Sequence, residues 1–129
     1  MANELSSGLS GGNVIHEGAT AIRTFTLTSG GDPVDLTDFT AFRSDVRPSV
    51  GSAVLYTTAT MTVIGDPTLG VLEWRLTVAE TNEIVSDPSA PTGTANIPFV
   101  MDIEGDKAGG ITEYLGHGAG SVQRKVTVL

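Results

Sequence analysis

The sequence predicts an all-β fold, a β-sandwich of about seven to nine short antiparallel strands with one brief helical turn. Apolar and polar residues alternate in most segments, which is the two-residue period of half-buried strands. Turn signals rich in Gly, Pro and Asp recur about every 8–12 residues. Pro48 and Pro98 interrupt strand patterns, which indicates sheet edges. Because a closed barrel has no edges, we expect a sandwich.

The first 13 residues are expected to form an arm in front of a single domain of residues 14–129. They are small and polar, with Gly and Ser around two leucines, a composition typical of flexible segments. One interpretation is a frayed terminus. The other is an arm that becomes ordered against a neighbouring subunit, with Leu5 and Leu9 as its anchors.

The first half of the domain alternates strands and polar turns. Phe25 and Leu27 share one face of a strand, and threonines share the other. Residues 32–38 form an acidic corner in which Pro33 favours a turn. Pro48 ends the strand that follows this corner. Strands are expected over residues 14–15, 21–28, 40–47, 53–56 and 60–64.

The second half contains the clearest strand pattern of the chain. Leu72, Trp74 and Leu76 alternate with charged residues over 71–78, and Trp74 is expected to be the largest part of the core. Pro98 makes the strand over 94–104 an edge strand or a bulged one. The other expected elements are helical turns over 79–85, a hairpin loop over 104–110, a strand over 111–115, a glycine-rich link over 116–120 and a last strand over 122–128.

The composition excludes several classes of partner. The net charge is −8, with a pI of about 4.4, which argues against binding nucleic acid or anionic lipid, since both attract Lys and Arg. The chain has no cysteine, so disulfides and thiolate metal sites are excluded. No apolar run approaches the roughly 20 residues that span a bilayer. The N-terminus lacks the basic and apolar regions of a signal peptide.

No catalytic group of residues is apparent, so we expect no enzymatic activity and no cofactor. His16 is placed at a strand start and His117 in a glycine-rich loop, without the spacing of a metal pair. Two acidic clusters could offer oxygen ligands to Ca²⁺, although neither has the spacing of an EF-hand and alternating acids usually mark a solvated strand face. These clusters are Asp32, Asp35 and Asp38, and Asp102, Glu104 and Asp106.

Three apolar side chains are left on the outer faces of the predicted strands. Val100 is expected on the outer face of its strand. Ile64 faces away from Met61 and Val63, and Tyr114 faces away from Leu115. A second layer could cover them, as near the corner of a sandwich. The alternative is that Ile64, Val100 and Tyr114 contact another subunit, together with Leu5 and Leu9.

From about Gly18 onward, the chain carries a series of landmarks in order. They are Phe25-Thr26-Leu27-Thr28, Pro33-Val34-Asp35-Leu36-Thr37, Asp45-Val46-Arg47-Pro48-Ser49, Gly70-Val71-Leu72-Glu73-Trp74-Arg75-Leu76 with Ala79-Glu80-Thr81, Asp102-Ile103-Glu104-Gly105, and Val126-Thr127-Val128. Together they resemble a family of small virion proteins of tailed phages and prophages. These proteins contain an immunoglobulin-like β-sandwich, and the pattern is similar to the N-terminal domain of phage baseplate upper proteins.

The resemblance implies a non-enzymatic structural component of the tail, baseplate or fibre connector, made in the host cytoplasm and located in the virion. Its implied partners are other virion proteins and further copies of itself in three- or six-fold symmetry. The alternatives are a decoration protein of the head or tail tube, and a free-standing carbohydrate-binding or adhesin-like module that contacts cell-surface glycans. The chain departs from the family in a longer stretch over 86–94 and a longer loop around His117.

Overall fold

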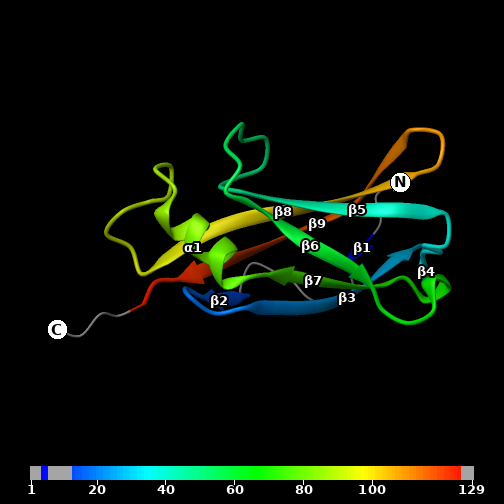
Figure 1. Ribbon diagram of the computed structural model, residues 1–129, viewed down its shortest axis with the longest axis horizontal. Helices are drawn as coiled ribbons and strands as arrows, with labels where there is room; N and C mark the ends of the chain where they lie inside the picture. Colours follow the sequence, from blue (N-terminus) through cyan, green and yellow to red (C-terminus); the bar gives the residue numbers. More distant parts are fainter. Residues whose placement is uncertain (1–3, 6–12, 126–129) are drawn as a thin grey trace.

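The computed structural model describes residues 4–5 and 13–125, which form a two-layer β-sandwich (Figure 1). Sheet I contains, in spatial order, β1 (Glu4–Leu5), β3 (Ala21–Ser29), β7 (Val71–Leu76) and β6 (Thr57–Val63), with β4 (Asp32–Pro33) paired to β3. Sheet II contains β5 (Phe39–Arg47), β8 (Asn96–Lys107), β9 (Ile111–Gln123) and β2 (Val14–His16). The predicted fold class, an immunoglobulin-like all-β sandwich, is confirmed.

Strand β6 joins the two sheets along one side of the sandwich. Its residues 57–59 pair with β5, whereas residues 60–63 pair with β7. A strand that changes sheets in this way makes a corner. On the far side of sheet II, β2 runs parallel to β9, and all other pairings among the described strands are antiparallel.

The core lies between the sheets and is centred on Trp74, which is fully buried as predicted. The indole ring lies 6.3 Å from the ring of Phe99, with an angle of 11° between their planes. Its Nε1–H donates a hydrogen bond of 2.9 Å to the hydroxyl of Ser44, which is also fully buried. The one polar atom of the indole is therefore satisfied inside the core.

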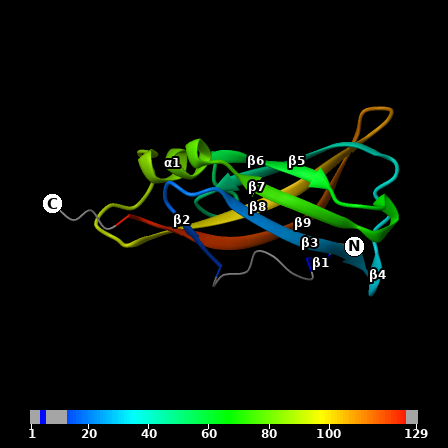
Figure 2. The ribbon, with the colours of Figure 1, turned by 60° about the horizontal axis from the view of Figure 1, so that its bottom comes forward.

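The two ends of the sandwich are closed by different elements (Figure 2). At one end lies α1 (Val78–Ser86), which confirms the predicted helical turns and extends them by one residue on each side. A capping box between Thr77 and Glu80 explains where it starts, since each side chain accepts a hydrogen bond from the other residue's backbone N–H. At the other end lie the corner at 32–38 and the 3-10 turn η1 (Pro67–Leu69).

The acidic corner at 32–38 is held by its own side chains. The Asp35 carboxylate accepts hydrogen bonds from the hydroxyl and the backbone N–H of Thr37, and these bonds lower the pKa of Asp35. This Asx turn aims Leu36 into the core, where it is buried. The backbone N–H of Leu36 donates to the carbonyl of Pro67 at 2.9 Å, which ties the corner to η1.

Gly70 is required where η1 leads into β7. Its φ angle is +70°, and a Cβ atom would lie 2.8 Å from the carbonyl oxygen of Leu27 and 2.9 Å from that of Val34. Asp66 caps η1 by accepting hydrogen bonds from the backbone N–H and the hydroxyl of Thr68, which lower the pKa of Asp66. Both sides of this short turn are thus fixed by specific residues.

The structure corrects two strand predictions of the first half and the hairpin. Residues 53–56 are irregular, and the strand expected over 60–64 begins earlier, at Thr57. The hairpin loop expected over 104–110 contains only residues 108–110, because β8 continues to Lys107. The expected last strand over 122–128 lies partly outside the described residues, and within them β9 ends at Gln123.

The glycine-rich link predicted over 116–120 is wrong, because these residues are the middle of β9. Their glycines, Gly116, Gly118 and Gly120, are buried. A Cβ on Gly120 would lie 2.8 Å from the ring of Phe99, and one on Gly105 of β8 would lie 2.5 Å from the ring of Phe39. Glycine in these strands therefore marks close packing.

Pro98 lies at neither an edge strand nor a bulge, contrary to the prediction. Strand β8 is central, between β5 and β9. Pairing with β5 ends where Val100 lies opposite Arg47, so Pro98 extends beyond the end of β5. Its missing N–H therefore removes no hydrogen bond from that ladder.

Candidate functional site

The outer face of sheet II carries three aligned rows of side chains. Inward positions of β5, β8 and β9 are buried, and the intervening residues point outward. The strand registers place Arg47, Val100 and Ala119 in the first row, Asp45, Asp102 and His117 in the second, and Arg43, Glu104 and Tyr114 in the third.

A β-bulge in β9 brings Tyr114 and His117 onto the same face. Residues three apart in a regular strand point to opposite faces. The register of β9 on β8 shifts between them, which leaves Leu115 as an extra residue that is buried. As a result both Tyr114 and His117 are exposed on the outside of the sheet.

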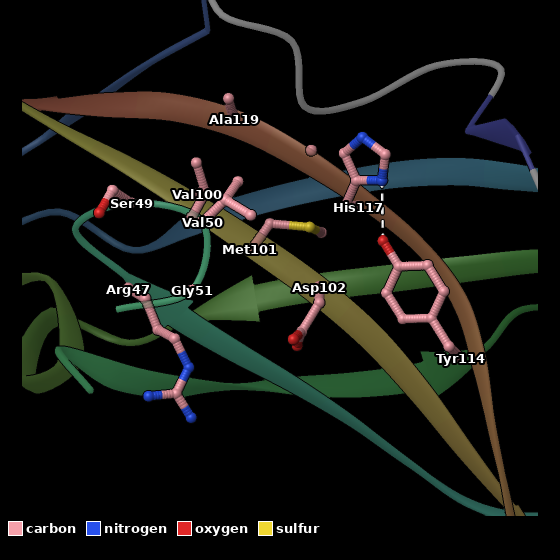
Figure 3. A pocket seen from close by; sticks show the side chains of 11 residues that line it. Arg47, Ser49, Val50, Gly51, Val100, Met101, Asp102, Tyr114, His117 and Ala119 are labelled. Carbon is pink, nitrogen blue, oxygen red and sulfur yellow. Dashed lines mark hydrogen bonds between the residues drawn. The ribbon is translucent and has the colours of Figure 1, made fainter. Parts of the chain in front are cut away.

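Tyr114 and His117 form a nearly flat aromatic strip (Figure 3). A hydrogen bond of 2.8 Å joins the Tyr114 hydroxyl to Nδ1 of His117, and the angle between the ring planes is 19°. Because the hydroxyl at the tip of the tyrosine makes this bond, the two rings lie end to end, with centroids 6.4 Å apart. Burial raises the pKa of Tyr114, and the carboxylate of Asp102 raises it further, so the hydroxyl is neutral at pH 7.

A tight turn after β5 stands opposite this strip. The N–H of Ser52 donates to the carbonyl of Ser49 at 3.1 Å, and Gly51 has a φ angle of +77°. This is the geometry of a type II turn, whose third residue is favoured to be Gly. The turn presents Val50 at its tip, where the side chain is 85% exposed.

Arg47 anchors the turn to the sheet. Its Nη1 donates to the carbonyls of Ser52 at 3.4 Å and Val54 at 3.3 Å, and its Nη2 lies 3.1 Å from the Asp45 carboxylate. Asp45 in turn donates its backbone N–H to the carboxylate of Asp102 at 3.2 Å. The charged groups beside the turn are thus held in place by hydrogen bonds from backbone and side chains.

An open hollow of about 660 Å³ lies between the turn and the aromatic strip. We call it the β8–β9 hollow. Val100, Gly118 and Ala119 contribute small apolar surfaces to its lining, Val50 reaches it from the turn, and Asp102 lies between the apolar part and the aromatic strip (Figure 3). Its volume is within the range of about 300–1,000 Å³ of small-ligand sites.

The structure brings together two of the five predicted contact residues. Val100 and Tyr114 both line the β8–β9 hollow. Ile64 does not line it, because it follows β6 in sheet I and is 40% exposed there. Leu5 lies in β1 at the register position opposite Leu27. Leu9 lies outside the described residues.

Sequence reasoning missed His117 and Val50 as members of this site. His117 was expected in a loop because glycines surround it, and the bulge that turns it toward Tyr114 has no signal of its own in the sequence. The signal for Val50 was available, since Pro48 followed by Val50-Gly51 is typical of an exposed turn. This signal indicated the turn, but it did not indicate that the turn is anchored beside the outer face of sheet II.

Sheet I presents a different outer surface, which we call the threonine face. It consists of small hydroxyl and aliphatic side chains with one ion pair, between Glu73 and Arg75 at 3.2 Å. Ile64 lies at its end, where its N–H donates to the carbonyl of Val71. The outward residues are Ile22, Thr24, Thr26 and Thr28 of β3, Val71, Glu73 and Arg75 of β7, and Thr60 and Thr62 of β6, with Ile64 after it.

The two acidic clusters do not come together as metal sites. Among residues 4–5 and 13–125, no group of three or more acidic or histidine side chains is placed to hold a metal ion. Asp35 bonds its own turn, and Asp106 accepts a hydrogen bond from the hydroxyl of Thr112. His16, in β2, and His117, in β9, lie in different strands. Within the same described part of the chain, no helix is long and apolar enough to cross a membrane.

Comparisons with known proteins give a likeness of fold alone. No protein-family model matches the chain, and no curated protein matches its sequence. Solved structures do match, among them the crystal structure of the RIG-5 IG1 homodimer, with 9% sequence identity and a TM-score of 0.43. That match covers 98% of this chain and 100% of the other. We draw no functional conclusion from a likeness of this degree.

Proposed function

We propose that this chain is a non-enzymatic structural component of a tailed-phage virion, located at the tail, baseplate or fibre connector. The observation that carries the proposal is the threonine face of sheet I, which offers neighbouring virion proteins a surface of low charge. The landmarks in the sequence support the same role by resemblance.

The threonine face suits a contact between proteins because little charge has to be desolvated. The chain has a net charge of −8, yet among residues 13–125, whose side chains the structure describes, this face carries only Glu73 and Arg75 as charged residues, which pair with each other. At the edge of the sheet, the register places Glu4 of β1 opposite Thr28. Removing hydroxyl groups from water costs far less than removing unpaired carboxylates. A twisted sheet face of this kind packs on another sheet at about 10 Å, as the layers of a sandwich do.

The described part of the N-terminal segment reaches the same sheet. Glu4–Leu5 forms β1, which pairs with β3 at the side of sheet I away from β7. We infer that the predicted arm of residues 1–13 and the threonine face with Ile64 contact neighbouring subunits together. Three- or six-fold assembly follows from the symmetry of phage tails, and further copies of this chain are its proposed partners.

The first experiment is quantitative peptide mass spectrometry on purified particles of the phage that encodes the chain. A low copy number in multiples of three or six would support a baseplate or fibre-connector location. Hundreds of copies would instead indicate a decoration protein of the head or tube. Absence from the particle would refute the proposal and favour a free-standing binding module.

The role of the threonine face is tested by Ile64→Asp in the same particles. Introducing a carboxylate at a buried contact should reduce incorporation of the chain about tenfold or more. The matched control is Ile111→Asp, because Ile111 is 53% exposed and lies at the start of β9, away from sheet I. Equal incorporation of both variants would show that the face makes no contact.

A further inference from the structure

We propose that the β8–β9 hollow is a binding site for a neutral saccharide. This goes beyond the structural role and does not depend on it, since the hollow lies on sheet II and the threonine face on sheet I. The proposal is built from the shape of the aromatic strip, the polar groups beside it and the charge of the chain.

The aromatic strip provides the flat surface. The rings of Tyr114 and His117 lie end to end, 19° from coplanar, and Tyr114 is 49% exposed. A pyranose ring has one face made of C–H groups, and such a face packs on the electron-rich face of an aromatic ring. The hydrogen bond between the two rings fixes the strip before any ligand binds, so little side-chain freedom is lost on binding.

The polar groups are placed where ring hydroxyls would be. Asp102 lies beside the strip, and one of its carboxylate oxygens is already held by the N–H of Asp45. A carboxylate fixed in this way accepts hydrogen bonds from two adjacent hydroxyls. Arg47 lines the same hollow, where its guanidinium is bonded to the turn and to Asp45, and the neutral hydroxyl of Tyr114 is a further hydrogen-bonding group.

The apolar part of the hollow limits what can bind. Val50, Val100 and Ala119 form a surface without charge on the side opposite the strip. A site with a few oriented polar groups in an otherwise apolar hollow of about 660 Å³ matches the general anatomy of small-ligand sites. A saccharide fits this division because it is amphipathic, with C–H faces and a rim of hydroxyls.

The charge of the chain selects a neutral saccharide. The net charge is −8, and Asp102 is in the hollow itself. An acidic sugar would therefore meet long-range repulsion as well as a local carboxylate. A proline-rich peptide would also pack on an aromatic strip. It lacks the adjacent hydroxyls from which Asp102 is placed to accept hydrogen bonds, so binding of such a peptide is a contrary outcome of the test.

The test is an amide-resolved NMR titration of the isotope-labelled chain with maltotriose, mannotriose and chitotriose. At least one of these neutral sugars should bind with a dissociation constant of about 1 mM. The shifted amides should fall in residues 49–51, 100–102 and 114–119. Sialyllactose, which carries a carboxylate, should bind about tenfold more weakly or not at all.

Variants distinguish a contribution of the aromatic strip to binding from an effect on folding. Tyr114→Ala should weaken binding about tenfold or more, because it removes half of the flat surface. Tyr114→Phe keeps the ring but loses the bond to His117, and a loss of about two- to fivefold is expected. Ile111→Ala, at another exposed position of β9 that does not line the hollow, should bind as the unaltered chain does.

Each other outcome would overturn the proposal. Shifts with none of the three sugars, or shifts that Tyr114→Ala leaves unchanged, would show that the strip binds no neutral saccharide. Equal or tighter binding of sialyllactose would contradict the selection by charge. Shifts in the same residues with hexaproline and none with the sugars would identify a peptide site. All of these are measured on the isolated chain, so the copy number in a particle does not affect them.

Discussion

The hydrogen bond between Trp74 and Ser44 should be one of the most sensitive points of the core. Both side chains are fully buried, and the Nε1–H of Trp74 has its 2.9 Å partner in the Ser44 hydroxyl. Ser44→Ala removes the acceptor and leaves a buried N–H without a partner, which costs about 1–3 kcal/mol. For a chain of this length, each kcal/mol corresponds to a fall of about 4 °C in the melting temperature.

The assay is urea unfolding followed by fluorescence, which reports this site directly because Trp74 is the only tryptophan. A double-mutant cycle with Trp74→Phe, followed by circular dichroism, isolates the bond from the change in packing. The two substitutions together should cost less than their sum by about 1 kcal/mol. Ser29→Ala, at an exposed strand position, is the control. Additive costs, or a Ser44→Ala variant as stable as this control, would refute the reasoning.

Three further predictions concern the ends of the sandwich and the N-terminal segment. Gly70→Ala should lower the free energy of unfolding by more than about 2 kcal/mol, because the new Cβ would meet two backbone oxygens. Gly30 also has a positive φ, but no atom lies near the place of its Cβ, so Gly30→Ala should lower the free energy of unfolding by only about 1 kcal/mol in the same assay. The pKa of Asp66 is lowered by its hydrogen bonds to Thr68, so its contribution to stability is full above the ordinary pKa of 3.8 and is lost as pH falls through the lower folded value. Asp66→Asn should therefore reduce the fall of the melting temperature with decreasing pH, measured in thermal melts at a series of pH values. An unchanged fall would contradict this. Deleting residues 1–12 should leave the melting temperature of the isolated chain nearly unchanged, since β1 pairs with β3 over only two residues and the buried side chains of residues 13–125 run from Ile15 to Val122. A fall of many degrees would show that residues 1–12 contribute to the stability of the fold.

The strands with a strong local pattern were predictable from the sequence. In β7, apolar side chains alternate without interruption around Trp74, and in β3 Phe25 and Leu27 alternate with threonines, and both strands lie where the pattern indicates. The helix was predictable for a similar reason, since its capping box at Thr77 and Glu80 is a local signal. Such elements depend on interactions between residues that are close in the sequence, so one sequence is enough to predict them.

The two ends of β9 were predicted as strands, but its middle, over 116–120, was not predictable, because these glycines are required by residues far along the chain. Gly116, Gly118 and Gly120 have the composition of a link, and only the ring of Phe99 beside Gly120 explains why a strand there needs glycine. The bulge at Leu115 likewise depends on pairing with β8. The hollow, which needs both features, therefore could not be inferred from the sequence, although Val100 and Tyr114 were singled out as exposed.

The landmarks behind the family resemblance are largely residues that the fold itself needs. Leu36 fills the core at one end, Gly70 sits under two backbone oxygens, and Trp74 is the centre of the core. Their spacing therefore supports the sandwich more directly than it supports a place in a virion. Val50 and His117, which line the β8–β9 hollow, both lie outside these landmarks.

The parallel pairing of β2 with β9 has a mechanical consequence. The chain enters through β2 and leaves through β9 in the same direction, and the ladder between them extends from the bond of Ser121 to Asn13 to the bond of Glu17 to Gln123, each 2.9 Å long. A pull that draws the two ends apart would slide these strands past each other, so the bonds would be loaded in shear and resist together rather than open one after another. The sandwich would thus be stiff along the line that joins the chain before β2 to the chain after β9.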